Sequence, residues 1–204
     1  MAATAAGADY LGFIFWQYSK RYISIEGATN IAGALRLRPS CPSLVGVFVD
    51  ESASDMASVL DSCQLDLAQL SGSEPPGMIG DPQSPLYGRS YKALRPASLA
   101  EAQAEAEWYV PPDFSNPHPS LLLDAYHPEL PGGTGRRVDW NMAAQMVQEV
   151  PGLMLAGGLT PGNVAQAVQL VRPFAVDVAS GVESSPGRKD QALVKAFISE
   201  ARTV

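Results

Sequence analysis

The sequence is poor in the residues that build metal centres and disulfide frameworks. Its 204 residues include only two cysteines and two histidines. Cys41 and Cys63 are too few for a disulfide framework or a cysteine-rich zinc site. His118 and His127 both lie in proline-rich stretches, which makes a histidine-based metal site improbable. We therefore expect a protein that holds no metal.

The chain also lacks a surplus of positive charge and a long apolar run. It has 14 lysines and arginines against 21 acidic residues, so no basic excess exists to neutralise the phosphates of a nucleic acid. The longest early apolar run, Tyr10 to Trp16, is far shorter than the roughly 20 residues of a membrane helix. No lysine or arginine precedes it, as one would in a signal peptide. We expect a cytoplasmic protein without nucleic-acid or membrane partners.

Short apolar runs recur along the chain and predict a parallel sheet. They are nearly continuous rather than alternating, which is typical of strands buried on both faces. Apolar residues at helical spacing lie between them, for example Met56, Val59 and Leu60, so strand and helix alternate as in an α/β protein. The predicted strands are Tyr10–Phe15, Leu44–Val49, Leu67–Leu70, Tyr91–Leu94, Leu121–Leu123, Leu153–Ala156 and Ala175–Val178.

Seven strands in successive βα units favour a (β/α)8 TIM barrel that is incomplete at its N-terminus. Such a barrel has eight strands, whereas residues 1–7 have the pattern of the last turns of a helix that ends at a glycine. We expect one TIM-barrel domain over residues 1–204, with the first β-strand and most of the first helix missing. An open doubly wound sheet is the alternative, but no Gly-x-Gly-x-x-Gly run follows the first strand.

Glycine-containing segments after the last two strands predict an anion site. They are residues 157–161 (GGLTP) and 180–183 (SGVE). Paired glycines let backbone N–H groups approach an anion, and the dipole of a helix that begins at Thr160 and Pro161 would favour it. In TIM barrels a phosphate commonly lies between the loops after strands seven and eight. This placement favours a phosphate ligand over a plain tight turn.

Two other strand ends carry side chains suited to catalysis or binding. Asp124 directly follows Leu121–Leu123, where partial desolvation favours the protonated form that a general acid needs. A salt-bridged structural carboxylate is the alternative. The run Gly132–Gly135 beyond it is either a loop that closes over a ligand or a flexible turn. Arg21, after the first strand, suits a ligand carboxylate or belongs to a solvated cationic loop.

The two cysteines do not share this placement at the ends of strands. Cys41 and Cys63 come before the strands Leu44–Val49 and Leu67–Leu70. We therefore expect both on the opposite face, away from a ligand, in a structural role.

Taken together, these segments resemble the phosphoribosylanthranilate isomerase family of tryptophan biosynthesis. The likeness covers almost the whole chain in one order, and the combination is highly specific although each piece alone is weak. The matching segments are 7–15 (GADYLGFIF), 19–24 (SKRYIS), 45–49 (VGVFV), 122–124 (LLD), 132–135 (GGTG) with Asp139 and Trp140, 155–159 (LAGGL) with Asn163 and Val164, and 177–183 (DVASGVE) with Pro186, Gly187, Lys189 and Asp190.

The resemblance implies an Amadori rearrangement without metal or organic cofactor. N-(5-phosphoribosyl)anthranilate becomes 1-(2-carboxyphenylamino)-1-deoxyribulose 5-phosphate. A general acid protonates the furanose ring oxygen and opens the ring to a Schiff base, and a general base then takes the C2 proton. The resemblance implies that Asp124 is the acid, that Arg21 binds the anthranilate carboxylate and that Asp177 lines the sugar. The implied phosphate ligands are Gly157, Gly158, Ser180 and Gly181.

Two positions depart from the family pattern. The family's base is a cysteine in a Lys-x-Cys-Gly run at the end of the first strand, which would lie upstream of Met1, so the 204 residues as written hold no base. Ser71 stands where the family usually has a histidine. One alternative is an inactive homologue that binds a sugar phosphate without catalysis. Another is a different barrel isomerase or lyase acting on a phosphorylated aminosugar. We expect a monomer or a homodimer.

Overall fold

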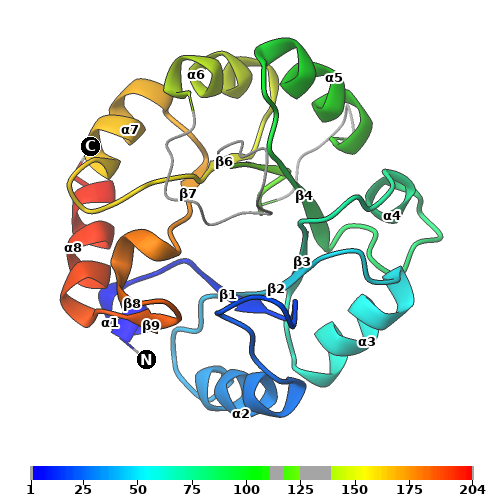
Figure 1. The fold of residues 1–204 in the computed structure, drawn as a ribbon. Coiled ribbons are helices and arrows are strands. Elements are labelled where there is room, and N and C mark those ends of the chain that lie inside the picture. Colours follow the sequence, from blue (N-terminus) through cyan, green and yellow to red (C-terminus); the bar gives the residue numbers. More distant parts are fainter. Residues whose placement is uncertain (1, 111–116, 125–138, 204) are drawn as a thin grey trace. The chain divides into compact units, whose positions relative to one another are not determined.

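The chain is described by a computed structural model that covers residues 2–110, 117–124 and 139–203. It divides into two compact units, Met1–Tyr91 and Lys92–Val204. Each unit consists of parallel strands that alternate with helices (Figure 1).

The first unit contains the parallel strands β1 to β3. Strand β1 (Tyr10–Ile14) pairs with β2 (Ser43–Phe48), and β2 pairs with β3 (Leu67–Leu70). The Ala68 N–H donates to the Arg89 carbonyl oxygen at 2.9 Å, just before β4 (Ser90–Leu94) begins. The helices are α1 (Ala2–Ala6), α2 (Ile25–Arg36), α3 (Ala53–Ser62) and α4 (Gly77–Gly80).

Apolar burial and serine caps explain why these segments form. The strand residues Leu44 and Leu70 and the α3 residues Met56 and Leu60 are fully buried, with 0% exposure. Each such side chain contributes about 1.5–3 kcal/mol by leaving water. Helix α3 begins where the Ser52 hydroxyl accepts the Asp55 N–H at 3.1 Å, and Ser24 caps α2 in the same way.

The second unit continues with parallel strands. The β4 residues Lys92–Leu94 pair with β5 (Leu121–Leu123), β5 pairs with β6 (Leu153–Leu155), and β6 pairs with β7 (Ala175–Val176). The other elements are α5 (Leu99–Tyr109), α6 (Trp140–Glu149), α7 (Val164–Val171), the 3-10 helix η1 (Ser180–Val182), the antiparallel pair β8 (Glu183–Ser185) and β9 (Arg188–Lys189), and α8 (Gln191–Ala201).

The strand order distinguishes between the two predicted topologies. The strands run β1 to β7 in the order of the chain, whereas the strand order of a doubly wound sheet reverses at a switch point. The structure therefore has the βα topology of a (β/α)8 protein, with seven parallel strands.

Each of the seven predicted strands is present, with small differences at the ends. The largest is in β7, which was predicted to run to Val178 and ends at Val176. Strand β6 ends at Leu155, whose carbonyl oxygen accepts the Asp177 N–H at 2.8 Å. Among the described residues, no backbone hydrogen bond joins β6 to the chain after Asp177, so the strand pairing ends there.

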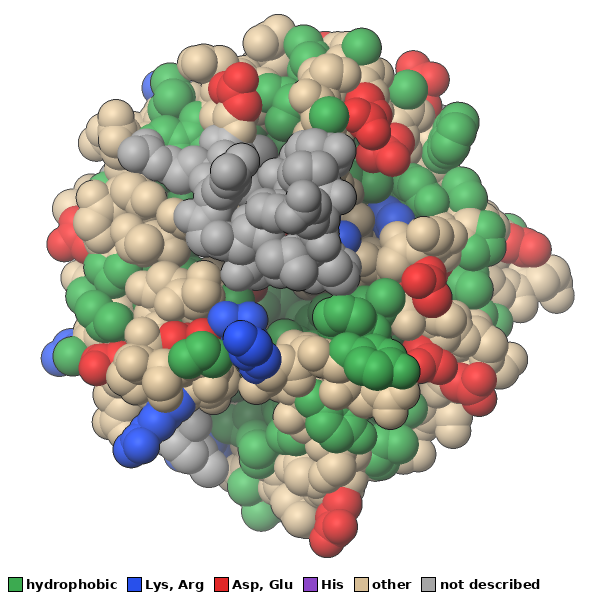
Figure 2. Space-filling view, in the orientation of Figure 1, with side chains coloured by type: hydrophobic (Ala, Val, Ile, Leu, Met, Phe, Trp, Pro, Cys, Tyr) green, Lys and Arg blue, Asp and Glu red, His purple; other side chains and the backbone are tan. Residues whose placement is uncertain are grey.

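The surface agrees with the acidic composition. On the face drawn in Figure 2, acidic side chains are scattered among neutral ones, and basic side chains occur in small separate groups. In the described ranges, no helix combines the length and the apolar character needed to cross a membrane.

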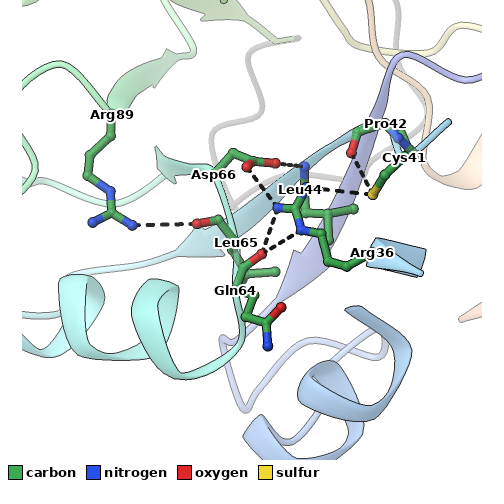
Figure 3. Close-up of polar contacts among 8 residues, drawn as sticks. All are labelled: Arg36, Cys41, Pro42, Leu44, Gln64, Leu65, Asp66 and Arg89. Atoms are coloured by element: carbon green, nitrogen blue, oxygen red, sulfur yellow. Dashed lines mark hydrogen bonds and ion pairs between the residues drawn. The ribbon is translucent and has the colours of Figure 1, made fainter. Parts of the chain in front are cut away.

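A polar cluster ties α2 to the amino ends of β2 and β3 (Figure 3). The Arg36 guanidinium donates to Asp66 Oδ1 and to the Gln64 carbonyl oxygen, both at 2.7 Å. Asp66 Oδ2 accepts the Leu44 N–H at 2.7 Å. Arg36 also reaches the Cys41 sulfur at 3.6 Å. Asp66 therefore accepts hydrogen bonds both from the Arg36 guanidinium and from a backbone N–H near the start of β2.

Asp66→Ala should lower the free energy of unfolding by about 1–2 kcal/mol, because the Leu44 N–H and Arg36 lose their shared acceptor. Urea denaturation followed by circular dichroism measures the change. Glu51→Ala is the control, since it removes the same charge from an exposed side chain of the same unit. Equal stability of the Asp66 variant and the control would contradict a structural role for the cluster.

Candidate active site

An arginine and a carboxylate meet at the carboxyl ends of β4 and β5. Arg95 follows Leu94, the last residue of β4, and Asp124 follows Leu123, the last residue of β5. Arg95 Nε lies 3.6 Å from Asp124 Oδ2, and the two side chains are 24% and 19% exposed. The Asp124 N–H donates to the Leu94 carbonyl oxygen at 2.9 Å, which fixes the backbone at this point.

Asp177, at the end of β7, lies close enough to Asp124 for the two charges to interact. Burial and the charge of Asp124 together raise the pKa of Asp177 to about 6, against the opposing charge of Lys189 and the Val178 N–H. The residue still reaches solvent, and water weakens both raising effects. The direction of the shift remains: the folded structure favours the protonated form of Asp177.

Lys189, in β9, adds a cation whose charge acts on Asp177. Its ammonium donates to the Ala179 carbonyl oxygen at 2.6 Å and to Glu183 Oε1 at 3.2 Å. Its charge lowers the pKa of Asp177. Cations thus stand at both sides of the carboxylate pair, Arg95 beside Asp124 and Lys189 toward Asp177.

The two predicted phosphate loops contact each other within the second unit. Gly157 and Gly158 adopt φ angles of 86° and 65°, a region that favours glycine. A Cβ at Gly181 would collide with the carbonyl oxygen of Leu159, so only glycine permits this approach of the two loops. Among the described residues, the N–H groups of Gly157 and Gly158 have no hydrogen-bond acceptor. These two donors are available to a ligand.

The helix after the first of these loops starts later than predicted. Thr160 and Pro161 lie in a turn, and α7 begins at Val164. The Asn163 side chain explains the delay, because its Oδ1 accepts the Thr160 N–H at 2.8 Å and its Nδ2 donates to the Gly158 carbonyl oxygen at 3.0 Å. These bonds close the loop as a turn before the helix can start.

The remaining predicted site residues belong to the first unit or lie outside the described residues. Arg21 is half-buried in the turn between β1 and α2, and its N–H donates to the Ser19 hydroxyl at 3.1 Å. Ser71, after β3, is 5% exposed, and its hydroxyl accepts from Gln69 Nε2 at 3.1 Å. The run Gly132–Gly135 lies outside the described residues.

The cysteines lie where the sequence predicted. Cys41 comes just before β2, and Cys63 ends α3 ahead of β3. Cys63 is buried and accepts a hydrogen bond from the Thr29 hydroxyl at 3.4 Å. Both therefore lie at the amino ends of their strands.

Sequence reasoning assigned no role to Arg95, Lys189 or Glu183. Arg95 carries the same signal as Asp124, a charged side chain directly after a buried strand, and that rule would have found it. Lys189 and Glu183 are six residues apart in the chain, and only the β8–β9 hairpin makes them partners.

Comparison with known proteins identifies the family. Residues 1–200 match the family model described as N-(5'phosphoribosyl)anthranilate (PRA) isomerase. The chain belongs to this family. The N-(5'-phosphoribosyl)anthranilate isomerase of Geobacter sp. strain M21 is 43% identical over 202 residues, which cover 99% of this chain and 91% of that relative.

Solved structures agree. The phosphoribosylanthranilate isomerase of Thermotoga maritima superposes with a TM-score of 0.81 at 34% identity, covering 100% of this chain and 92% of that one. A phosphoribosylanthranilate isomerase in complex with reduced 1-(o-carboxyphenylamino)-1-deoxyribulose 5-phosphate gives 0.78 at 32% identity, with the same coverage.

The raised pKa of Asp177 predicts an unusual dependence of stability on pH. The folded chain binds this proton more tightly than the unfolded chain, whose carboxyl has the ordinary pKa of 3.8. Stability contributed by the protonated group is therefore present below 3.8 and is lost as the pH rises through about 6. Asp177→Asn should unfold at a higher temperature than the parent at neutral pH, and the gain should shrink toward the acid end.

Thermal unfolding between about pH 3.5 and 7.5 measures this difference. Glu200→Gln, which neutralises an exposed carboxylate on α8, should leave the pH profile unchanged. A gain from Asp177→Asn that grows toward acid pH would contradict the assignment.

Proposed function

We propose that the chain catalyses the isomerisation of N-(5'-phosphoribosyl)anthranilate in tryptophan biosynthesis, with Asp124 as general acid. The observation that supports it most is the proximity of a carboxylate pair, Asp124 and Asp177, in the unit that also carries two contacting glycine loops. A substrate with a phosphate at one end and a furanose oxygen to be protonated needs both features. The family match supports the same reaction.

The phosphate is assigned to the loops at Gly157, Gly158, Ser180 and Gly181. Backbone N–H groups there supply fixed donors without a side chain that must be ordered. Asp177 is assigned to the sugar, between the phosphate loops and the acid. As the group with the raised pKa it is able to present a proton to a sugar hydroxyl in a hydrogen bond.

The anthranilate carboxylate is assigned to Arg21. Its guanidinium offers a planar pair of donors that matches a carboxylate. The half-burial of Arg21 supports this role over a solvated loop cation, because its neighbour Lys20 in the same turn is exposed.

A second candidate function is sugar-phosphate binding without turnover. The observation in its favour is that Cys41 and Cys63 precede the amino ends of β2 and β3, whereas Asp124 and Asp177 follow the carboxyl ends of β5 and β7. We propose that neither cysteine is the general base, so that the 204 residues alone turn over slowly. A fluorescence assay for loss of the substrate distinguishes the two functions. Fusion of a strand with a Lys-x-Cys-Gly run to the chain should restore turnover. Rapid turnover without that strand would indicate a different base.

We also propose the domain organisation, location and partners of the chain. Residues 1–204 form one TIM-barrel domain that acts in the cytoplasm as a monomer or homodimer. Its partner is the small-molecule substrate, with no cofactor, nucleic acid or membrane.

In any version of the chain that turns over, Asp124→Asn should lower kcat by about 10²–10⁴-fold, because the amide has nearly the same shape but no proton to donate. Steady-state kinetics and a melting curve measure activity and fold separately. A variant within a few-fold of the parent kcat would remove Asp124 from the acid role.

Arg21→Ala should raise KM by about tenfold with little change in kcat, because it removes a charge-assisted carboxylate contact. A melting curve measures the effect on stability separately. Lys20→Ala is the matched control: it removes the same charge from the adjacent, exposed position. Equal KM values for the two variants would show that Arg21 does not bind the substrate carboxylate.

A further inference from the structure

Lys189 makes two contacts that the proposed reaction does not explain. Its ammonium donates to a backbone carbonyl, that of Ala179, at 2.6 Å and to the Glu183 carboxylate at 3.2 Å. The Glu183 side chain is only 4% exposed, whereas that of Lys189 is 45% exposed. A carboxylate buried to this degree requires a cation, so the pair differs from an ordinary exposed salt bridge.

The backbone that carries Lys189 is anchored. The next residue, Asp190, donates its N–H to the Val182 carbonyl oxygen at 2.8 Å. The Asp190 carboxylate accepts the Ala192 and Leu193 N–H groups at 2.8 and 3.0 Å and so begins α8. The backbone next to Lys189 is therefore held in place. The two hydrogen bonds of the Lys189 side chain in turn fix the loop that contains Ala179.

The contact with Ala179 determines the direction of the next amide. The described residues contain no cis peptide bond, and in a planar trans peptide the carbonyl and the following N–H point in opposite directions. A carbonyl oxygen of Ala179 that faces Lys189 therefore directs the Ser180 N–H away from Lys189. A hydrogen bond to the carbonyl also polarises the peptide and strengthens its N–H as a donor.

We propose that Lys189, held by Glu183, is a positioning residue that orients the Ser180 amide toward the substrate phosphate. This inference rests on the assignment of the phosphate to the Ser180–Gly181 loop. Lys189 acts through the peptide group and does not touch the phosphate. Its positive charge additionally faces Asp177, so the residue that orders the phosphate loop also stabilises the neighbouring carboxylate.

The test is the affinity for inorganic phosphate, measured by titration calorimetry, with the Ser180 amide followed by nuclear magnetic resonance. Lys189→Met should weaken phosphate binding by about tenfold, the value of one charge-assisted hydrogen bond, in titrations run well below its melting temperature, which should fall because Glu183 loses its cation. Lys189→Arg keeps the charge and the donors and should stay within about threefold of the parent. In a version that turns over, Lys189→Met should raise KM more than it lowers kcat.

Arg188→Met is the matched control, since it removes the same charge from the adjacent exposed residue of β9 and should leave phosphate binding unchanged. An equal loss of phosphate affinity in both variants would indicate a general effect of net charge and would overturn the proposal. Phosphate binding as tight as the parent's in Lys189→Met would also overturn it. If that variant does not fold, Glu183→Gln gives the same test. A version with the fused Lys-x-Cys-Gly strand that binds phosphate at Ser180 without turnover contradicts the proposed function alone. A parent that binds no phosphate contradicts the phosphate assignment and this inference together.

Discussion

The close approach of Gly181 to the Leu159 carbonyl oxygen is the contact on which the candidate site depends. Any Cβ at position 181 would collide with that oxygen, so the two loops can meet only with glycine there. Their meeting places two sets of backbone donors together beside Asp177. Lys189 and the Asn163 side chain hold the loops from either side, through the Ala179 and Gly158 carbonyls. The loops are therefore ordered before any ligand arrives, which reduces the entropic cost of binding.

The second constraint is the charge arrangement around two neighbouring carboxylates. Burial and the nearby charge of Asp124 disfavour the ionisation of Asp177 and raise its pKa to about 6. Arg95 forms an ion pair with Asp124, and the charge of Lys189 opposes the rise in the pKa of Asp177. Two carboxyl groups in unequal surroundings are able to divide the tasks of giving and keeping a proton. The fold accepts a cost in stability at neutral pH for this arrangement.

The strands and the positions of Asp124 and Asp177 were predictable from the sequence. An apolar run and the residue that follows it are local features, which adjacent residues define. The end of β7 and the start of α7 were not predictable, since they depend on the length of β6 and on the Asn163 side chain. The pairing of Arg95 with Asp124 likewise joins residues 29 positions apart. The raised pKa of Asp177 was not predictable either, since it depends on burial and on the charges of Asp124 and Lys189, which are distant in the chain.

The most direct measurement is a phosphate titration of the parent chain followed through its backbone amide resonances. If the two loops form the phosphate site, the largest shifts occur at the N–H groups of Gly157, Gly158, Ser180 and Gly181, and Gly181→Ala abolishes them while the fold persists. Shifts centred on other residues, or an unchanged titration in the Gly181 variant, would contradict the site.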